Sequence, residues 1–281
     1  MSERGRLMDG QGTASAAGRP DEDALKPHIP HSARVWNYLL GGKDHFEADR
    51  RAAEHSISLK PDMVEQARAD RAFLGRAVRY LAGDQGVRQF LDIGTGLPTA
   101  ENTHQVAQRV APECRIVYVD HDPLVLAHAR ALLTSSPEGE CHYIDADLRD
   151  PDKILADAGR LLDLTRPVAV MLVGILHHVE GPDASHAIVR RLMSDMPSGS
   201  RLVVNHPTSV VHGERSENSA RGWNESGGRP TVTLRTPDEI AAYFDGLVIE
   251  EPGVVSCSRW RPTPDLSEPE VDAFCAVARK P

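Results

Sequence analysis

The stretch from Phe90 to Pro98 constrains the fold of this chain more than any other. It reads FLDIGTGLP, an apolar run that ends in an acid and a Gly-x-Gly turn. Val106, Ala107 and Val110 then recur at helical spacing, so the sequence predicts a strand, a tight turn and a helix. This unit holds nucleotide-like ligands in doubly wound sheets, because glycine lets the backbone turn sharply and come close to a ligand. A Gly-x-Gly turn alone is a weak signal, so its surroundings decide the interpretation.

The residues after the turn argue against a dinucleotide or a nucleoside triphosphate. The dinucleotide pattern needs a third small residue where this chain has Thr99, and Pro98 has no N–H to offer a phosphate. Glu101 adds negative charge to the first helical turn, which repels an anion. No Gly-Lys-Ser/Thr of a Walker loop follows. A ligand with a sugar and a base but no phosphate fits better, which weakens a nicotinamide dehydrogenase as an alternative.

Three further apolar segments follow at the spacing of strand–helix units. Arg115–Asp120 and Cys141–Asp147 both end in acids, as the first strand does. The segment 168–176 is almost continuously apolar, which is typical of a central strand buried on both faces. An acid at the end of the second strand can accept hydrogen bonds from both ribose hydroxyls. The series therefore predicts a parallel sheet that binds a nucleoside at its carboxyl edge.

The ordered motifs resemble those of class I S-adenosylmethionine-dependent methyltransferases. The segments that carry this likeness are Asp92–Gly96, Tyr118–Asp120, Asp145–Leu148 and Gly174–His178. Ser32–Arg50 resembles the signature of one family of that class, domain-of-unknown-function family 574, also called an S-adenosylmethionine methyltransferase family. The likeness covers about Pro30 to Pro281 and departs from the general superfamily at Pro98, where many members have a third glycine.

That resemblance implies an α/β, Rossmann-like fold with helices on both faces of the sheet. Seven strands are expected, mostly parallel, with an antiparallel last strand. Residues 247–255 and 274–279 are the expected last two strands, which form a hairpin. A long helix from Pro61 should place its apolar residues in the core and its charged residues on a solvated face.

The resemblance also implies S-adenosyl-L-methionine as the cofactor. Gly94, Thr95 and Gly96 would let the backbone pass close to its adenosine and methionine parts. Asp92 would lie beneath that turn, near the ammonium group of the ligand.

The later motifs supply the other expected contacts with the cofactor. Asp120 should chelate the ribose hydroxyls, and His121 should flank the adenine. Asp147 with Leu148 should address the adenine edge, while Asp145 is expected to face the other way. Gly174 lies at the exit of the fourth strand, next to the reacting methyl group.

The N-terminal signature has two interpretations. Its dense apolar patch ends at Gly41 and Gly42, so sequence physics favours a short helix that caps the sheet. The family resemblance instead favours a flap that closes over the cofactor, with Tyr38, Gly41, Gly42 and Lys43 as candidate contacts. Arg34 or Lys43 would pair with the carboxylate of the cofactor.

His177 and His178 directly follow the fourth strand and are the candidate catalytic residues. A histidine there could deprotonate a hydroxyl or amine nucleophile, an effect worth about 10²–10⁴-fold in rate. The alternative is that both histidines pack or hydrogen-bond locally. Adjacent histidines project in different directions, and no ligand set at metal spacing completes them, so we expect no metal. His206 and His212 are weaker candidates of the same kind.

The sequence suggests three regions. Residues 1–27 are expected to be a tail without a fold, 28–82 a helical cap or flap, and 83–281 the cofactor-binding domain. Within the last, the polar segment of about 207–235 is either a disordered loop or a lid, and Trp223 is its candidate aromatic contact.

Composition bounds the partners and the compartment. The net charge of -9 disfavours a nucleic acid as partner. No apolar run reaches the ~20 residues that span a membrane, and the N-terminus has no apolar core of a signal peptide. The four cysteines show no CxxC spacing, which favours a reducing cytoplasm.

We expect a small-molecule methyl acceptor; a non-catalytic S-adenosylmethionine-binding regulator or partner subunit is the alternative. The acceptor atom and the oligomeric state stay undetermined.

Overall fold

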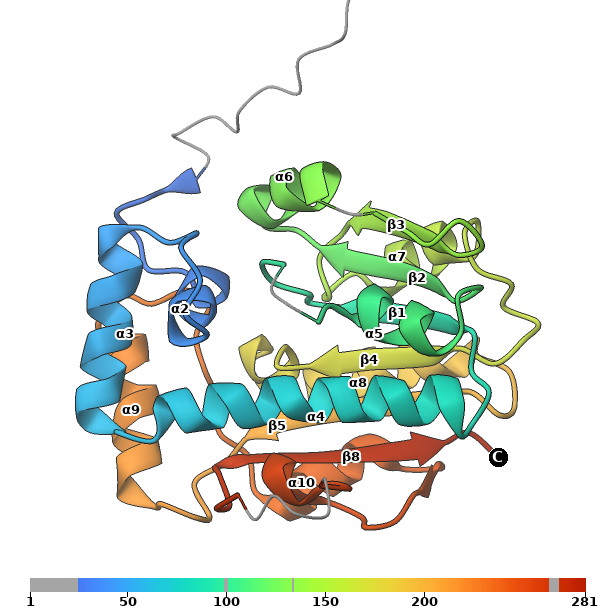
Figure 1. Ribbon diagram of the computed structural model, residues 1–281. Helices are drawn as coiled ribbons and strands as arrows, with labels where there is room; N and C mark the ends of the chain where they lie inside the picture. The colour runs from blue at the N-terminus through green and yellow to red at the C-terminus, as the bar shows by residue number, and fades with distance from the viewer. Residues whose placement is uncertain (1–24, 99–100, 133, 263–267) are drawn as a thin grey trace, which may run out of the picture.

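The computed structural model describes residues 25–98, 101–132, 134–262 and 268–281. The predicted tail falls mostly outside these residues, as does Thr99. In the described chain one sheet has the strand order β3-β2-β1-β4-β5-β8-β6, and β7 also pairs with β8 (Figure 1). The strands are β1 (Gln89–Ile93), β2 (Arg115–Asp120), β3 (Glu140–Asp145), β4 (Ala169–Val173), β5 (Arg201–Pro207), β6 (Val248–Ile249), β7 (Val255–Ser256) and β8 (Ala273–Arg279).

The first five strands are parallel, and β8 runs antiparallel to β5 along its whole length. Strand β1 is buried at every position, in agreement with its apolar sequence. This arrangement confirms the predicted α/β fold with an antiparallel last strand. Because the carboxyl ends of parallel strands meet at one edge, the motif residues gather on that edge.

The predicted strand over residues 247–255 is wrong as a continuous element. It is interrupted, and its two ends, β6 and β7, pair separately with β8. Pro252 lies in the break and has no N–H for a sheet ladder, while Gly253 takes a φ of +89°. The two short strands together occupy the seventh position of the sheet.

Helices cover both faces of the sheet. On one face, α4 and α5 pack over a core that contains Phe73, Phe90 and Met171. On the other, α7, α8 and η2 cover a core that contains Leu172, Leu192 and Phe244. The bounds of these elements and of their neighbours are α4 (Met63–Gly83), α5 (Thr103–Val110), α6 (Pro123–Leu132), α7 (Pro151–Ala158), η1 (Leu176–His178), α8 (Pro182–Ser194), α10 (Pro237–Ala241), η2 (Ala242–Phe244) and η3 (Cys257–Arg259).

Three helices stand beyond the carboxyl ends of the parallel strands, at the left of Figure 1. They are α2 (Ser32–Leu39), α3 (Glu47–Leu59) and α9 (Glu214–Glu225), and we call them the cap. Their shared core contains Val35, Leu39, Ala53 and Trp223. Helix α9 is the centre of the 207–235 segment, so the disordered-loop alternative for that segment is wrong.

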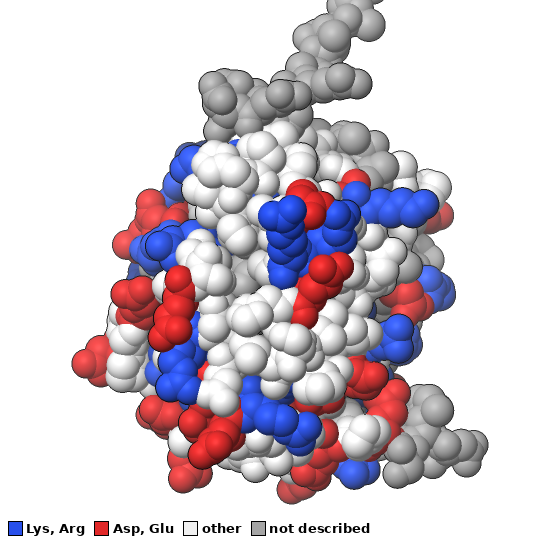
Figure 2. Space-filling view, turned by 90° about the vertical axis from the view of Figure 1, so that its left-hand side faces the viewer, with Lys and Arg blue, Asp and Glu red and all other residues white. Residues whose placement is uncertain are grey.

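The outer face of the cap carries charges of both signs. Figure 2 shows Lys and Arg interspersed with Asp and Glu there, around an uncharged area. On α3, Glu47 pairs with both Arg50 and Arg51. A continuous basic surface is therefore missing from this face. Among the described residues, no helix is long and apolar enough to cross a membrane.

Candidate functional site

A cavity of about 550 Å³ lies between the strand ends and the cap. The carboxyl ends of β1, β2 and β4 line it from one side, and Trp36 of α2 and Trp223 of α9 line it from the other. Its volume falls within the ~300–1,000 Å³ that small-molecule sites occupy. Every residue of the predicted glycine turn, Gly94 to Gly96, lines this cavity.

Glycine is needed at the two positions of that turn for different structural reasons. Gly94 has a φ of +77°, and its N–H donates to the carbonyl oxygen of Val119 at 2.8 Å. A Cβ at Gly94 would lie 2.4 Å from the Ile175 side chain, so a larger residue does not fit. Gly96, with a φ of +62°, would place a Cβ in open space. Gly94 thus holds two strand ends together, whereas Gly96 keeps the cavity open.

Asp120 is fixed by backbone amides at the end of β2. Its Oδ1 accepts from the N–H groups of His121 and Asp122 at 2.8 and 3.0 Å. Its Oδ2 accepts from the Gly96 N–H at 2.9 Å. Burial raises the pKa of this carboxyl, although the three backbone N–H groups oppose the shift. The result is an oriented acceptor at the cavity wall, which fits the hydroxyls of a ribose.

Asp92 lies at the end of β1, where it faces α4. The Thr103 hydroxyl donates to its Oδ2 at 2.6 Å, and the charge of Arg71 acts on it. Burial raises the pKa of Asp92 to about 6. Arg71 also lines the cavity and donates to Asn102 Oδ1 at 3.1 Å. An acid and an arginine together have the charges to hold the ammonium and carboxylate of an amino acid.

Arg34 is not the ligand-carboxylate partner that the sequence suggested. Its side chain is 4% exposed, and its Nε donates to Asp49 Oδ2 at 2.8 Å. Its other nitrogens donate to the carbonyl oxygens of Leu25 and Ile29. Because these bonds tie α2 to α3 and to the preceding segment, Arg34 is a structural residue of the cap.

The other predicted cap contacts also lie off the cavity wall. Tyr38, Gly41, Gly42 and Lys43 are not among the residues that line it. Tyr38 donates instead to Glu54 Oε1 at 3.3 Å on α3, and the other three follow the end of α2. The cavity is lined by other positions of the same helix: Ser32, Ala33, Val35, Trp36, Asn37 and Leu39. Helical periodicity explains Tyr38, because it lies four residues after Arg34 on the stripe of α2 that does not line the cavity.

The expected adenine-edge residues line the cavity with an unforeseen neighbour. Asp147, Leu148 and His121 all contribute to its wall. Arg149 lines it too and donates to Asp147 through Nε and Nη2, at 2.9 and 2.7 Å. This ion pair lowers the pKa of Asp147. Asp145 is exposed, in keeping with its predicted orientation.

His177 and His178 line the same cavity and follow Gly174 in the chain. His178 Nδ1 donates to the carbonyl oxygen of Thr231 at 2.8 Å, which leaves Nε2 as the acceptor nitrogen. Burial lowers the pKa of His178 to about 4 and that of His177 well below its usual value. Both imidazoles are therefore neutral at pH 7. His206 does not line the cavity and stacks on Tyr243.

Several polar residues of the cavity wall were missed by the sequence analysis. Asp70 was assigned to a solvated face of its helix, but it is 7% exposed and lines the cavity. Asn205 and Thr208 do the same at the end of β5. A signal was present for Asn205 alone, since its amide interrupts an otherwise apolar strand. Only the packing shows that these positions face inward.

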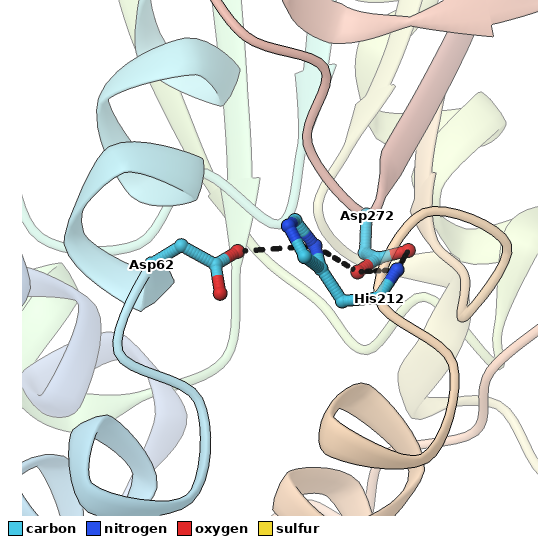
Figure 3. Close-up of side chains that lie close together, drawn as sticks. All are labelled: Asp62, His212 and Asp272. Carbon is cyan, nitrogen blue, oxygen red and sulfur yellow. Dashed lines mark hydrogen bonds and ion pairs between the residues drawn. The ribbon is translucent and has the colours of Figure 1, made fainter.

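Lys60 and Asp272 line the cavity and belong to an acid–histidine group near the start of α4. Figure 3 shows Asp62, His212 and Asp272 converging from three different segments. His212 Nδ1 lies 2.7 Å from Asp272 Oδ2 and 3.4 Å from Asp62 Oδ2. Lys60 Nζ lies 3.0 Å from Asp62 and 3.9 Å from Asp272. The group is compact enough for a metal ion, but Lys60 already supplies positive charge, so we interpret it as an ion-pair network that joins three chain segments.

Fold and site together define a class I, Rossmann-like methyltransferase, in which an acid and a glycine turn meet at the carboxyl edge of the sheet. Residues 19–281 match the model of the S-adenosyl methyltransferase family, and the chain belongs to this family. It is therefore an S-adenosylmethionine-dependent methyltransferase, and the residues described above fit that cofactor.

Two solved structures are similar over nearly the whole chain. A DUF574 family protein from Streptomyces avermitilis MA-4680 is 41% identical, with a TM-score of 0.87, and the match covers 92% of this chain and all of that one. A candidate methyltransferase from Thermobifida fusca YX is also 41% identical, with a TM-score of 0.83, over 93% and 98% of the two chains. Among proteins of curated function, none matches this chain.

Proposed function

We propose that this methyltransferase acts on a small-molecule acceptor, which it encloses between the strand ends and the cap. The observation that carries the proposal is the single cavity lined by both the cofactor motifs and the cap helices. One space of about 550 Å³ must hold cofactor and acceptor together. That volume favours a small acceptor over a folded macromolecule.

Each motif residue has a defined task in binding. Asp120 accepts the ribose hydroxyls, and Asp92 with Arg71 holds the charged amino-acid end. Asp147 and Leu148, with His121, border the adenine. When bound, S-adenosyl-L-methionine supplies an electrophilic methyl group. The protein then has to orient the acceptor and exclude water, and positioning of this kind can contribute about 7–11 kcal/mol to lowering a barrier.

His178 is the residue we propose as proton acceptor. The Thr231 carbonyl fixes its tautomer, so that Nε2 carries the free lone pair. The imidazole is neutral at pH 7, because burial lowers its pKa to about 4. His177, whose Nδ1 is buried without a hydrogen-bond partner among the described residues, packs against the His178 ring and supports it.

The same low pKa values favour a second candidate function. A protein that binds S-adenosylmethionine without transferring its methyl group would need no base of near-neutral pKa. Burial depresses the pKa of both histidines next to Gly174. A regulatory or partner protein is therefore the alternative to an active enzyme.

Ligand-dependent unfolding followed by a transfer assay distinguishes these functions. A ligand at about 100-fold its Kd stabilises a protein by ~2.7 kcal/mol. S-adenosylmethionine and S-adenosylhomocysteine should each raise the Tm by several degrees, and NAD should not. Tritiated methyl groups should then enter the low-molecular-weight fraction of a cell extract. Label in the macromolecular fraction would contradict a small acceptor, and binding without transfer to either fraction would favour the regulatory function.

A further inference from the structure

Three buried acceptor atoms in the cavity wall lack a hydrogen-bond partner among the residues that the structure describes. They are Asp70 Oδ1 on α4, Asn205 Oδ1 at the end of β5, and Thr208 Oγ1 just beyond it. All three side chains are more than nine-tenths buried, and all three residues line the cavity. Within the described residues none of these atoms receives a hydrogen bond. A buried acceptor without a donor costs about 1–3 kcal/mol, so the group is expected to meet a ligand.

The charges around this group favour a cation. Lys60 is the charged residue among those described that acts on Asp70. Its ammonium is already shared among Gln66, Asp62 and Asp272. The Cys257 thiol and the Asn205 amide are hydrogen-bond partners of the Asp70 carboxyl, and both are neutral, so they leave its charge without a second cation. This part of the cavity therefore has more negative than positive charge.

The group is next to the place expected for the reacting methyl. Asn205 pairs with Val173 across β5 and β4, one residue before Gly174. A Cβ built on Gly174 would lie 3.8 Å from Asn205 Oδ1. A molecule bound to Asn205 would thus reach the exit of β4.

We propose that Asp70, Asn205 and Thr208 form the acceptor-binding subsite, and that the acceptor is a small molecule with a primary amine. This assignment rests on the proposed function and names its substrate class. A primary ammonium has three N–H donors and no acceptor, which matches three unpartnered acceptor atoms. An alcohol has one O–H to donate, and a carboxylate would be repelled by Asp70. The aromatic rings of Trp36 and Trp223 in the same cavity suit an aromatic or aliphatic body on the amine.

Matched probes test the head group separately from the body. 2-Phenylethylamine, tryptamine and tyramine are each compared with the alcohol and the carboxylic acid of the same skeleton. Binding is measured by calorimetry, with and without S-adenosylhomocysteine. We expect amines to bind more tightly than both isosteres. Equal binding of the alcohols or acids, or no binding by any amine, overturns the proposal.

Isosteric variants locate the site. Asp70→Asn should weaken amine binding by about tenfold or more, because hydrogen bonds to charged groups are worth ~1.5–3 kcal/mol. Thr208→Val should weaken it less, and Asp84→Asn, an exposed residue at the end of the same helix, should change nothing. Unchanged amine affinity in both Asp70→Asn and Thr208→Val overturns the assignment. Failure of S-adenosylhomocysteine to bind would instead overturn the proposed function. The amine titration without S-adenosylhomocysteine would still test the amine subsite.

Discussion

Asp92 and Asp70 are buried carboxylates in different halves of the cavity, and they differ in how their oxygens are satisfied. Asp92, in the cofactor half, receives a hydrogen bond from Thr103 and is influenced by the charge of Arg71. Asp70, in the acceptor half, has an Oδ1 without a hydrogen-bond partner in the described part of the chain, and its carboxyl interacts with the neutral Cys257 and Asn205 side chains and with the charge of Lys60. Burial raises the pKa of Asp92 to about 6 and that of Asp70 to about 7.

This difference shows which half holds its acids with its own donors. In the cofactor half, backbone amides fix Asp120 and the Thr103 hydroxyl fixes Asp92. The acceptor half leaves buried acceptors unsatisfied, a cost that the protein bears until a donor binds. Unsatisfied buried groups of this kind cluster at functional sites, where a ligand completes them.

The largest expected effect is the pH dependence that Asp70 imposes on stability. Its pKa is higher in the folded protein than in the unfolded chain, so folding takes up a proton between about pH 4 and 7. Stability therefore falls as pH rises through that window, by up to roughly 4 kcal/mol for a shift of this size. Asp70→Asn should remove this loss, whereas Asp84→Asn should keep it, as measured by urea unfolding at a series of pH values.

The same experiment separates the two halves of the site. Asp92 contributes a slope of the same sign, but over a window that ends near pH 6. S-adenosylhomocysteine brings an ammonium to Asp92 and should suppress its part of the slope, while the Asp70 part persists. Loss of the whole slope on S-adenosylhomocysteine binding would contradict the division of the cavity.

A smaller effect, on the rate rather than on stability, is expected from His178→Gln. If Nε2 of His178 takes the proton of the acceptor, kcat should fall by at least about 100-fold while the affinity for S-adenosylmethionine stays the same. His206→Gln is the control, because that ring does not line the cavity. A rate within a few-fold of wild type would mean that His178 only packs and holds Thr231.

Asp120→Ala tests the cofactor half, and the expected change in affinity for S-adenosylmethionine is about tenfold. Loss of charged hydrogen bonds to the ribose should weaken S-adenosylmethionine binding at least roughly tenfold, since each is worth ~1.5–3 kcal/mol. Asp145→Ala makes the same change at an exposed strand end and should have no effect. Calorimetry measures the S-adenosylmethionine affinity of both variants. Equal affinities would contradict the assignment of Asp120 to the ribose hydroxyls.

The smallest effect is expected where the sequence analysis placed a contact that the structure moves elsewhere. Lys43→Ala and Tyr38→Phe should each change S-adenosylmethionine affinity by less than about twofold, because neither residue lines the cavity. Arg71→Gln should weaken it by more. A marked loss in Lys43→Ala would mean that the end of α2 moves onto the cofactor when it binds.

Several features of the fold could be predicted because their signals are local. Strands β1, β2 and β4 follow from short apolar runs, and helices α6 and α7 begin at Asp-Pro steps. The predicted strand over 247–255 failed at Pro252, although the sequence shows this proline, because proline has no N–H to offer a sheet ladder. The region boundaries over 1–27 and 28–82 stay predictions.

The sequence by itself predicted the cofactor half, because its residues lie at the carboxyl ends of parallel strands and each strand end is a short continuous motif. Asp92, Gly94 and Asp120 could be assigned from their positions in short motifs, and the structure places all three on one wall. Only the tertiary structure decided the acceptor half. Asp70, Asn205 and Thr208 come from a helix and a strand far apart in the chain, and their inward orientation depends on how α4 packs on the sheet. The same holds for α2, where packing against α3 and α9 selects Trp36, rather than Tyr38, to face the cavity.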